Sequence, residues 1–417
     1  MTSKARTGLA LRAYLAASHL IPLLARPMLS HRRRRGKEHD TRWVEKQGRR
    51  LAPGPAGRLV WLHAVGLGEV MSLRGLIARM ADQQPDVHFL VTSGTAASAR
   101  VFAGQLPPRT LHQFLPLDAP LYRRRFLDHF RPDLCIWAEQ DLWPGFVHDL
   151  AQRGIPQAIV AARMNDAAFA RHRKARGLFR DLYARMALIT AQDPETAAHL
   201  VTLGADARVT GSLKPAAPAL GCDRGELHTL QMALAGRFIW AVAPSHPADE
   251  DAALAAHDAL RTQDPGALLI VAPRHPDRRG IARPAPLKSQ GAVPGADDPL
   301  WVCDTFGDLG LVYPLAQAVL IGGTFDATQG HNPWEAAQLD CALLHGPQVG
   351  NFRSDFAALD VAGGAVPVTT AAEIAATLRR TDLAQVAGRA AAAAKSAGIA
   401  TDALAGDLCA LLETQHE

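Results

Sequence analysis

Short apolar runs alternate with longer, partly polar segments along most of this chain. Five such runs precede residue 200 and five follow residue 230, and all are rich in aliphatic residues. The runs cover residues 58–65, 87–93, 133–139, 157–163, 188–192, 238–245, 268–274, 300–305, 318–323 and 341–347. Continuous apolar strands separated by helix-length segments are typical of parallel sheets that helices cover on both faces. The pattern therefore predicts an α/β protein.

The two series of runs are separated by a stretch rich in proline and glycine, residues 211–225, as is typical of a linker. A chain of 417 residues is also too long for one ordinary core. We therefore expect two Rossmann-like, doubly wound domains that face a central cleft, with ligands at the carboxyl ends of the strands. We predict an N-terminal helix with its basic flank in residues 1–37 and a first domain in residues 38–212. A linker, residues 213–225, leads to a second domain, residues 226–417, which ends in an Ala-rich helical tail.

The N-terminal segment 8–29 is nearly all apolar, but Arg12, His19 and Arg26 interrupt it at intervals of seven residues. A central charge costs a membrane-spanning helix at least about 2.5 kcal/mol, which disfavours a span. On a helix these three residues form a narrow polar stripe opposite a broad apolar face, the pattern of a helix that lies in a membrane interface.

Four consecutive arginines, Arg32 to Arg35, follow this segment, with Lys37 close behind. Such a cluster suits anionic headgroups and keeps the following chain on the cytoplasmic side. We therefore predict a membrane anchor in residues 1–37. One alternative is an amphipathic helix packed on its own domain. A secretory signal peptide fits this segment less well, because no small-residue cleavage site follows it and the arginines would resist translocation.

Composition narrows the classes of partner. The net charge of +5 suits phosphates, nucleic acids or anionic lipids. No helix-turn-helix or RNA-binding signature is present, so a nucleic-acid partner is disfavoured. The five cysteines are scattered and form no Cys-x-x-Cys pair, which predicts neither a disulfide framework nor a zinc site and favours a reducing compartment.

The stretch "WLHAVGLGEVMSLRGL" begins a dinucleotide fingerprint with Gly66 and Gly68. The third glycine position holds Met71, and no acidic residue for a ribose follows the run that ends at Thr92, so dinucleotide binding is excluded. What remains is a strand, a tight turn and a helix that begins near Glu69. This places one carboxylate at a strand end, as a candidate catalytic residue. The alternative is a favourable charge on the helix dipole.

A second candidate lies in "LIGGTFDATQGHNPWEAAQL", where Gly330 and His331 precede Asn332 as a predicted N-cap, Pro333 as the first helical residue and Glu335 in the first turn. Free backbone N–H groups at such a helix start can hold a phosphate without a metal. The alternative is a well-capped helix that binds nothing.

Two further strand ends of the second series carry polar clusters. One contains Ser245 and His246, and the other contains Arg274 and His275. An arginine at such a position supplies a bidentate fork for phosphate or carboxylate. We therefore expect three loops of the second domain to converge on one anion.

Strand ends of the first series offer hydroxyl and carboxyl groups. Ser93 and Thr95 follow the second run, and Glu139 and Asp141 follow the third. The loop with Ser93 and Thr95 could form a helix start that binds an anion, and all four residues are candidate binding residues. The alternative for the first pair is an ordinary loop rich in serine and threonine.

Taken in order, the motifs resemble those of the 3-deoxy-D-manno-octulosonic acid (Kdo) transferases. They read "HAVGLGEV", "EQDLWP", "GIPQAIVAARMND", "VTGSLK", "APRHP", "DTFGDLGLVYPLA" and "GGTFDATQGHNPWEAA" followed by "GPQVGNF". The resemblance implies the GT-B fold and an inverting, membrane-associated glycosyltransferase of lipopolysaccharide biosynthesis. Such an enzyme passes Kdo from CMP-Kdo to a lipid A precursor on the cytoplasmic side of the bacterial inner membrane.

The resemblance also implies roles for individual residues. Glu69 falls on the proposed catalytic base. The CMP-sugar side falls on Arg274, His275, Gly330, His331, Asn332 and Glu335. No metal or other cofactor is implied, because the single phosphate of CMP can be balanced by backbone amides and arginine. Lys214, Arg163 and Arg274 are candidates for the carboxylate of the donor.

Some positions depart from the family pattern. This chain has Gly66 where the family usually has serine, Asp141 where it has glutamate and Ser212 where it has asparagine. These departures keep two alternatives open. One is a GT-B enzyme that uses another nucleotide sugar or acceptor, and the other is a non-catalytic, membrane-bound paralogue.

Overall fold

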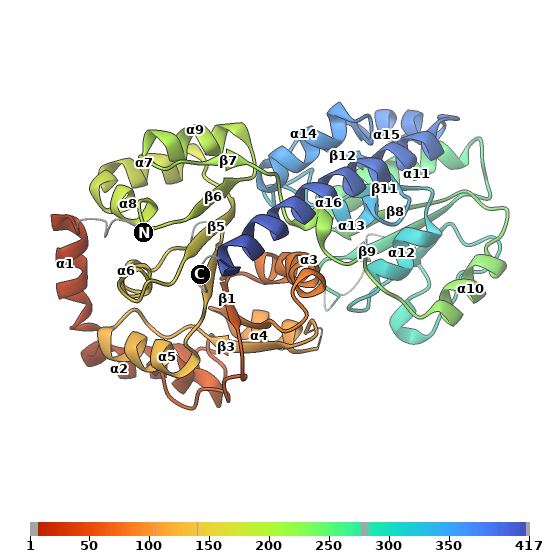
Figure 1. The fold of residues 1–417 in the computed structure, drawn as a ribbon. Coiled ribbons are helices and arrows are strands. Elements are labelled where there is room, and N and C mark those ends of the chain that lie inside the picture. The colour runs from red at the N-terminus through yellow and green to blue at the C-terminus, as the bar shows by residue number, and fades with distance from the viewer. Residues whose placement is uncertain (1–6, 105, 140, 277–280, 282, 414–417) are drawn as a thin grey trace. The chain divides into compact units, whose positions relative to one another are not determined.

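The computed structural model describes residues 7–104, 106–139, 141–276, 281 and 283–413. The chain separates into two compact units, Met1–Ala217 with Ile399–Glu417 (unit 1) and Pro218–Gly398 (unit 2). Each unit contains one sheet whose strands are all parallel, with helices between successive strands (Figure 1). The predicted α/β class with parallel sheets is therefore confirmed.

The sheet of unit 1 has the strand order β3-β2-β1-β4-β5-β6-β7. Its strands are β1 (Leu59–His63), β2 (His88–Ser93), β3 (Thr110–Phe114), β4 (Leu134–Ala138), β5 (Gln157–Ala162), β6 (Leu188–Ala191) and β7 (Arg208–Val209). All five predicted runs of the first series became strands. The hydrophobic pattern missed the two edge strands, because β3 carries polar residues and β7 is only two residues long and exposed.

Side chains of β1 alternate between the two faces of this sheet. Val60 and Leu62 belong to a core with α3 and with the end of α16, whereas Leu59 and Trp61 belong to a core with α5, α6 and α8. Because both faces are covered, polar side chains are largely confined to the strand ends. The helical elements of unit 1 are α1 (Leu9–Ser18), α2 (Ile21–Arg34), η1 (Arg42–Gln47), α3 (Leu67–Gln83), α4 (Ala96–Ala103), α5 (Pro120–Phe130), α6 (Pro144–Gln152), α7 (Asp166–Lys174), α8 (Arg176–Tyr183), α9 (Pro194–Thr202) and η2 (Lys214–Ala216).

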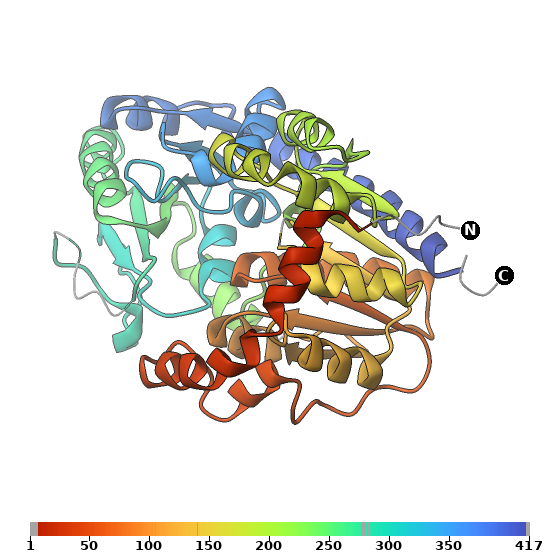
Figure 2. The same ribbon diagram turned by 90° about the vertical axis from the view of Figure 1, so that its left-hand side faces the viewer.

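The N-terminal segment forms two helices instead of the single expected helix (Figure 2, red). Pro22 explains the break, because proline lacks an N–H group and is favoured in the first turn of a new helix. Leu11 and Leu29 are buried on unit 1, and the Tyr14 hydroxyl donates to Asp118 at 2.7 Å. Part of the segment therefore packs on its own unit. Among the described residues, no helix has both the length and the apolar character that crossing a membrane requires.

The sheet of unit 2 has the strand order β10-β9-β8-β11-β12-β13. Its strands are β8 (Ile239–Ser245), β9 (Leu268–Pro273), β10 (Leu300–Val302), β11 (Ala318–Ile321), β12 (Ala342–His345) and β13 (Ala365–Pro367). All five runs of the second series became strands, and among the described strands of unit 2 the pattern missed the three-residue edge strand β13. The helical elements are α10 (Arg224–Ala233), α11 (Pro247–Arg261), η3 (Lys288–Gln290), α12 (Leu309–Leu315), α13 (Trp334–Ala337), η4 (Gly350–Phe352), α14 (Arg353–Val361), α15 (Ala371–Leu378) and α16 (Leu383–Glu413).

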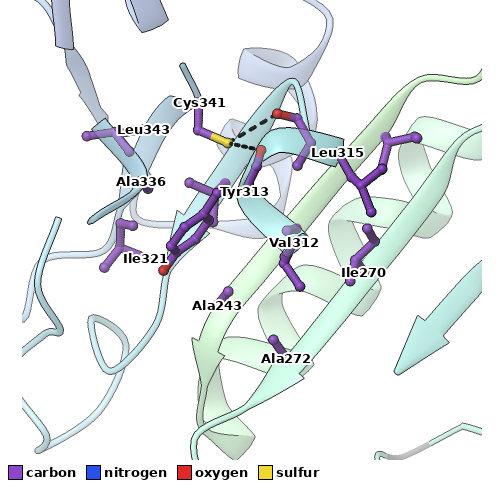
Figure 3. Packing of buried hydrophobic residues seen from close by; sticks show 14 of the residues in the cluster. Ala243, Ile270, Ala272, Val312, Tyr313, Leu315, Ile321, Ala336, Cys341 and Leu343 are labelled. Atoms are coloured by element: carbon purple, nitrogen blue, oxygen red, sulfur yellow. Dashed lines mark hydrogen bonds between the residues drawn. The ribbon is translucent and has the colours of Figure 1, made fainter. Parts of the chain in front are cut away.

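The core between α12 and the sheet of unit 2 is closely packed (Figure 3). Tyr313 and Val312 of α12 lie against Ala243 of β8 and Ile270 of β9. The Cys341 thiol donates to the carbonyl oxygens of Tyr313 and Ala316, at 3.0 and 3.1 Å. All five cysteines are free thiols.

Helix α16 requires a correction to the expected domain boundaries. Its first half contributes Val386 and Ala390 to the cores of unit 2, whereas Leu404 and Leu408 of its second half belong to a core of unit 1. The tail was assigned to the second domain because its even Ala-rich pattern does not distinguish which core each turn contacts. The expected linker, 213–225, is also divided, because unit 1 ends at Ala217.

Helix α3 and η2 approach closely at Gly75, where an added Cβ would overlap the carbonyl oxygen of Ala216. We predict that Gly75→Ala lowers the free energy of unfolding by about 1–3 kcal/mol, the usual cost of overpacking. Gly388→Ala in α16 is the matched control, since its Cβ would meet no atom within 4 Å, and it should stabilise the protein by about 0.5–1 kcal/mol. Urea denaturation followed by circular dichroism measures both changes. Equal stability of the two variants would contradict the packing.

Candidate functional site

Each sheet reverses its strand order at one point, and the candidate residues gather at the carboxyl ends of the strands on either side of it. In unit 1 the reversal lies between β1 and β4, and in unit 2 it lies between β8 and β11. Connections leave such a pair of strands in opposite directions, which opens a crevice outside their carboxyl ends. Glu69 follows β1 and Glu139 follows β4, while His246 follows β8 and His331 follows β11.

Glu69 lies in the first turn of α3 and is partly buried. Its carboxylate accepts a hydrogen bond from the backbone N–H of Gly66, so it caps its own helix. The alternative interpretation of Glu69 as a helix-start charge is thus realised in the structure. Its charge also acts on Glu139 and Asp141 and raises the pKa of both. The three carboxyl groups therefore form one acidic group, which we call the acidic cluster.

Glu139 adopts a left-handed backbone conformation, with φ of 58°. For a residue other than glycine this conformation costs roughly 1 kcal/mol or more and is common where a side chain must be aimed. Burial raises the pKa of Glu139, and the ammonium of Lys214, which lies 4.0 Å away, lowers it. Desolvation raises the pKa of Asp141 to about 6, and the charge of Glu69 acts in the same direction.

The loop after β4 is held in place by Trp143. Its indole N–H donates to Nε2 of His63 on β1, at 3.3 Å. Burial lowers the pKa of His63 to about 3, so this ring is neutral and can accept. Trp143 therefore ties the loop that carries Glu139 and Asp141 to the strand that precedes Glu69.

Ser93 and Thr95 differ in their surroundings. Ser93 is buried, and its hydroxyl lies 2.9 Å from Nε2 of His112. Thr95 is partly exposed and caps α4 by accepting from the Ser98 N–H at 3.1 Å. Of the two, only Thr95 is accessible at this strand end, whereas Ser93 links β2 to β3.

In unit 2, His246 and His331 form a stacked pair. Their rings are 5.1 Å apart and nearly parallel, and their Nε2 atoms are separated by 2.8 Å. Nitrogens at this distance share one hydrogen, so one ring donates and the other accepts. Burial lowers the pKa of His331 to about 4, with further lowering by His246 and then Arg274. The His331 ring is therefore neutral at pH 7.

Arg274 and His275 are exposed beside this pair. The His275 ring lies 6.1 Å from that of His246. Arg274 follows β9, and its backbone N–H donates to the carbonyl oxygen of Ser245 at 3.0 Å. We call His246, Arg274, His275 and His331 the basic cluster. The structure thus brings together three of the predicted loops of unit 2.

The loop after β11 has a supporting residue that sequence reasoning missed. The buried carboxylate of Asp249 accepts from the backbone N–H groups of Gly323, Phe325 and His246, at 2.6, 3.1 and 3.0 Å. It thereby fixes His246 and the loop that leads to His331. The sequence feature that could have revealed Asp249 is its position three residues after His246, the spacing of a capping box at the start of α11.

Ser245 is buried, and its hydroxyl donates to Glu250 at 2.6 Å. It therefore supports the loop after β8 rather than facing a ligand directly.

The helix start near Asn332 differs from the prediction. Helix α13 begins at Trp334 with Pro333 as its N-cap and is only four residues long, so its dipole is small. Asn332 accepts from the Trp334 N–H at 3.2 Å and donates to Glu335 at 3.1 Å. Gly330 has a φ of 87°, which glycine adopts readily. Burial raises the pKa of Glu335, and Asn332 and Arg274 lower it.

The two clusters have complementary chemistry. The acidic cluster can accept a proton from a hydroxyl group or bind hydroxyl groups by hydrogen bonds. The basic cluster can donate several hydrogen bonds to a phosphate or carboxylate.

A match to a family model covers residues 38–217, and that model describes 3-deoxy-D-manno-octulosonic-acid transferases (kdotransferases). A 3-deoxy-D-manno-octulosonic acid transferase from Rickettsia felis is 33% identical over 303 residues, which are 70% of this chain and 65% of that protein. A probable mitochondrial 3-deoxy-D-manno-octulosonic acid transferase from Arabidopsis thaliana is 32% identical over 359 residues, 82% of this chain and 80% of that protein.

Among solved structures, UDP-GlcNAc 2-epimerase from Neisseria meningitidis bound to UDP-GlcNAc has a TM-score of 0.52 at 11% identity, covering 81% of this chain and 94% of that one. At this identity the likeness concerns the fold alone, which is GT-B-like, with two parallel α/β sheets. The identity to the Arabidopsis protein over most of both chains shows that this chain belongs to the 3-deoxy-D-manno-octulosonic acid (Kdo) transferase family.

Proposed function

We propose that this protein is an inverting glycosyltransferase that moves Kdo from CMP-Kdo to a lipid A precursor in lipopolysaccharide biosynthesis. Membership of the Kdo transferase family supports the reaction. The observation that carries the proposal is the opposite chemistry of the two strand-order reversals, with carboxyl groups in unit 1 and imidazole and guanidinium groups in unit 2. The carboxyl groups of unit 1 supply a base for the acceptor, and the guanidinium and imidazole groups of unit 2 supply hydrogen-bond donors for the phosphate of the donor.

In the proposed reaction the basic cluster binds the phosphate of CMP-Kdo. Arg274 offers a planar fork of donors, and the His246–His331 pair offers imidazole N–H groups beside it. Asn332 and Glu335 hold the shape of the adjoining turn, with Gly330 providing its left-handed bend. As the bond to the sugar breaks, charge grows on the phosphate, and fixed donors stabilise that charge.

Glu69 is the proposed base that takes the proton from the attacking hydroxyl of the acceptor. Glu139, Asp141 and Thr95 are proposed to bind the acceptor through hydrogen bonds. Ser93 is omitted from this group because its hydroxyl contacts His112 in the interior. The pKa of Asp141 is raised to about 6, so this carboxyl group is mostly ionised at pH 7 and gains its proton as the pH falls through 6.

Glu69→Gln should lower the rate of Kdo transfer by about 10²- to 10⁴-fold, because the amide cannot accept the proton. Binding of CMP should be unchanged, since the basic cluster is intact. The assay incubates purified protein with CMP-Kdo and a tetraacylated lipid A precursor, and mass spectrometry of the lipid measures the product.

Glu373→Gln is the matched control for this variant. Glu373 also lies in the first turn of a helix and accepts from a backbone N–H, that of Thr369, at 2.6 Å. Because Glu373 caps its helix and has no proposed catalytic role, Glu373→Gln should leave the rate of Kdo transfer unchanged. Full activity of Glu69→Gln would contradict the proposed role of Glu69 as the base. Absence of transfer by the wild-type protein would favour the alternative that this chain is a non-catalytic paralogue.

Arg274→Ala should weaken CMP binding by about 10- to 100-fold, the effect of losing a charge-assisted hydrogen bond of about 1.5–3 kcal/mol. Isothermal titration calorimetry with CMP and with UDP measures this loss and the nucleotide preference together. Arg283→Ala is the control, because Arg283 is paired with Asp258 at 2.6 Å on the surface of unit 2. Tighter binding of UDP than of CMP would support the alternative that the enzyme uses another nucleotide sugar as its donor.

We further propose that α1 and α2 bind the surface of the inner membrane on its cytoplasmic side. Large apolar side chains remain exposed on these helices and the link between them, among them Leu9, Leu20, Leu23 and Leu24 at 60–83% exposure. Arg12, Arg26 and most of the arginines at 32–35 are exposed in the same segment. Apolar residues interspersed with arginines are the pattern of a segment that enters a headgroup region.

The double variant Leu23→Asp with Leu24→Asp should lose most of its binding to vesicles of phosphatidylglycerol and phosphatidylethanolamine in a sedimentation assay. The variant can no longer bury two leucine side chains in the membrane interface, and it adds two negative charges that anionic lipids repel. Val361→Asp is the control, since Val361 is 91% exposed on α14 of unit 2. Equal loss in both variants would contradict a role for this segment.

A further inference from the structure

Three residues of unit 1 place metal-ligating atoms close together, apart from the residues assigned to the reaction. Asp166 is the first residue of α7, while Glu195 and His199 lie one turn apart on α9. One ligand atom from each of the three lies within 4.8 Å of the other two. Helices α7 and α9 follow β5 and β6, which are neighbours in the sheet, so these residues lie at its carboxyl edge.

His199 is oriented in the way that metal-binding histidines are. Its Nδ1 lies 3.2 Å from the carbonyl oxygen of Met164. A carbonyl can only accept, so Nδ1 carries the proton, and in the neutral ring Nε2 presents its lone pair. That atom lies 3.6 Å from Oδ1 of Asp166. Phe169 stacks on the ring at 4.1 Å, nearly parallel, and holds its plane. A backbone partner that fixes the tautomer is the usual outer shell of a metal-ligating histidine.

We propose that Asp166, Glu195 and His199 bind one divalent cation of the zinc class. One imidazole nitrogen with two carboxylates is a donor set for Zn²⁺, Cu²⁺ or Ni²⁺, whereas Mg²⁺ and Ca²⁺ prefer oxygen alone. Asp166 and Glu195 are exposed, so their side chains can rotate to the roughly 2.0–2.2 Å that such a cation requires. Three protein ligands leave at least one position of a tetrahedral cation for water or another anion.

The consequence is a connection between the starts of two neighbouring helices. A bound cation ties the first turn of α7 to α9 and stabilises the folded form by an amount that grows with the logarithm of the free cation concentration once that concentration exceeds the Kd. The proposed transfer of Kdo involves none of these three side chains, so the site can be tested independently of activity.

The test titrates the full-length, tag-free protein with ZnCl₂ by calorimetry and with CuCl₂ by electron paramagnetic resonance. The wild type should bind one Zn²⁺ per chain and show coupling of one nitrogen to Cu²⁺. His199→Gln should lose the nitrogen coupling and weaken Zn²⁺ binding by more than about tenfold, the range seen when even an outer-shell partner is removed. Asp166→Asn should weaken Zn²⁺ binding and keep the nitrogen coupling.

His228→Gln and Cys222→Ser are the controls, because they remove an exposed imidazole on α10 and a partly exposed thiol from unit 2. Both should bind Zn²⁺ as the wild type does. The proposal is overturned if His199→Gln retains wild-type affinity or if a control removes the binding. It is also overturned if the wild type binds no Zn²⁺, which would leave Asp166, Glu195 and His199 as neighbouring polar side chains without a bound cation.

Discussion

Burial of both faces of the two parallel sheets is the constraint on which the rest of the structure depends. Every residue of β1, β4 and β11 is buried, so a polar group inside a strand must find a partner there, as His63 does with Thr92. Reactive side chains are therefore confined to the strand ends. The reversal of strand order opens one crevice in each sheet, and this topology brings Glu69 to Glu139 and His246 to His331 from distant parts of the sequence.

Much of this could be predicted from sequence, because buried parallel strands are continuous apolar runs. All ten predicted runs became strands, including the edge strand β10. The pattern failed at the other edge strands, β3, β7 and β13, which carry polar residues or are only two or three residues long. The tail was misassigned because Leu404 and Val386 look alike in sequence but pack in different units. Partners such as Asp166 and His199 escaped notice because ligand spacing within one segment cannot reveal contacts between two helices.

The pKa shifts in the two clusters have opposite directions. Repulsion from Glu69 and desolvation raise the pKa of Asp141 to about 6, so the acidic cluster favours a proton or a hydroxyl donor. Burial lowers the pKa of His331 to about 4, with further lowering by His246 and then Arg274, and a bound anion would oppose that lowering. Groups with perturbed pKa values at strand ends are typical of functional sites. This asymmetry agrees with a donor that carries a phosphate and an acceptor that supplies a hydroxyl group.

The capping role of Glu69 is compatible with a role as a base. A carboxylate has two oxygens, and the Gly66 N–H occupies one of them, which fixes the side chain while the second oxygen can accept another proton donor. An added Cβ at position 66 would lie 2.6 Å from the capping oxygen, a contact that a small rotation of the flexible Glu69 side chain relieves. The family pattern has serine there, and serine followed three residues later by glutamate is the usual capping box, in which the glutamate accepts from the backbone N–H of the serine. The departure at Gly66 therefore keeps the backbone hydrogen bond that orients the proposed base and lacks the hydroxyl group that a serine would add at this helix start.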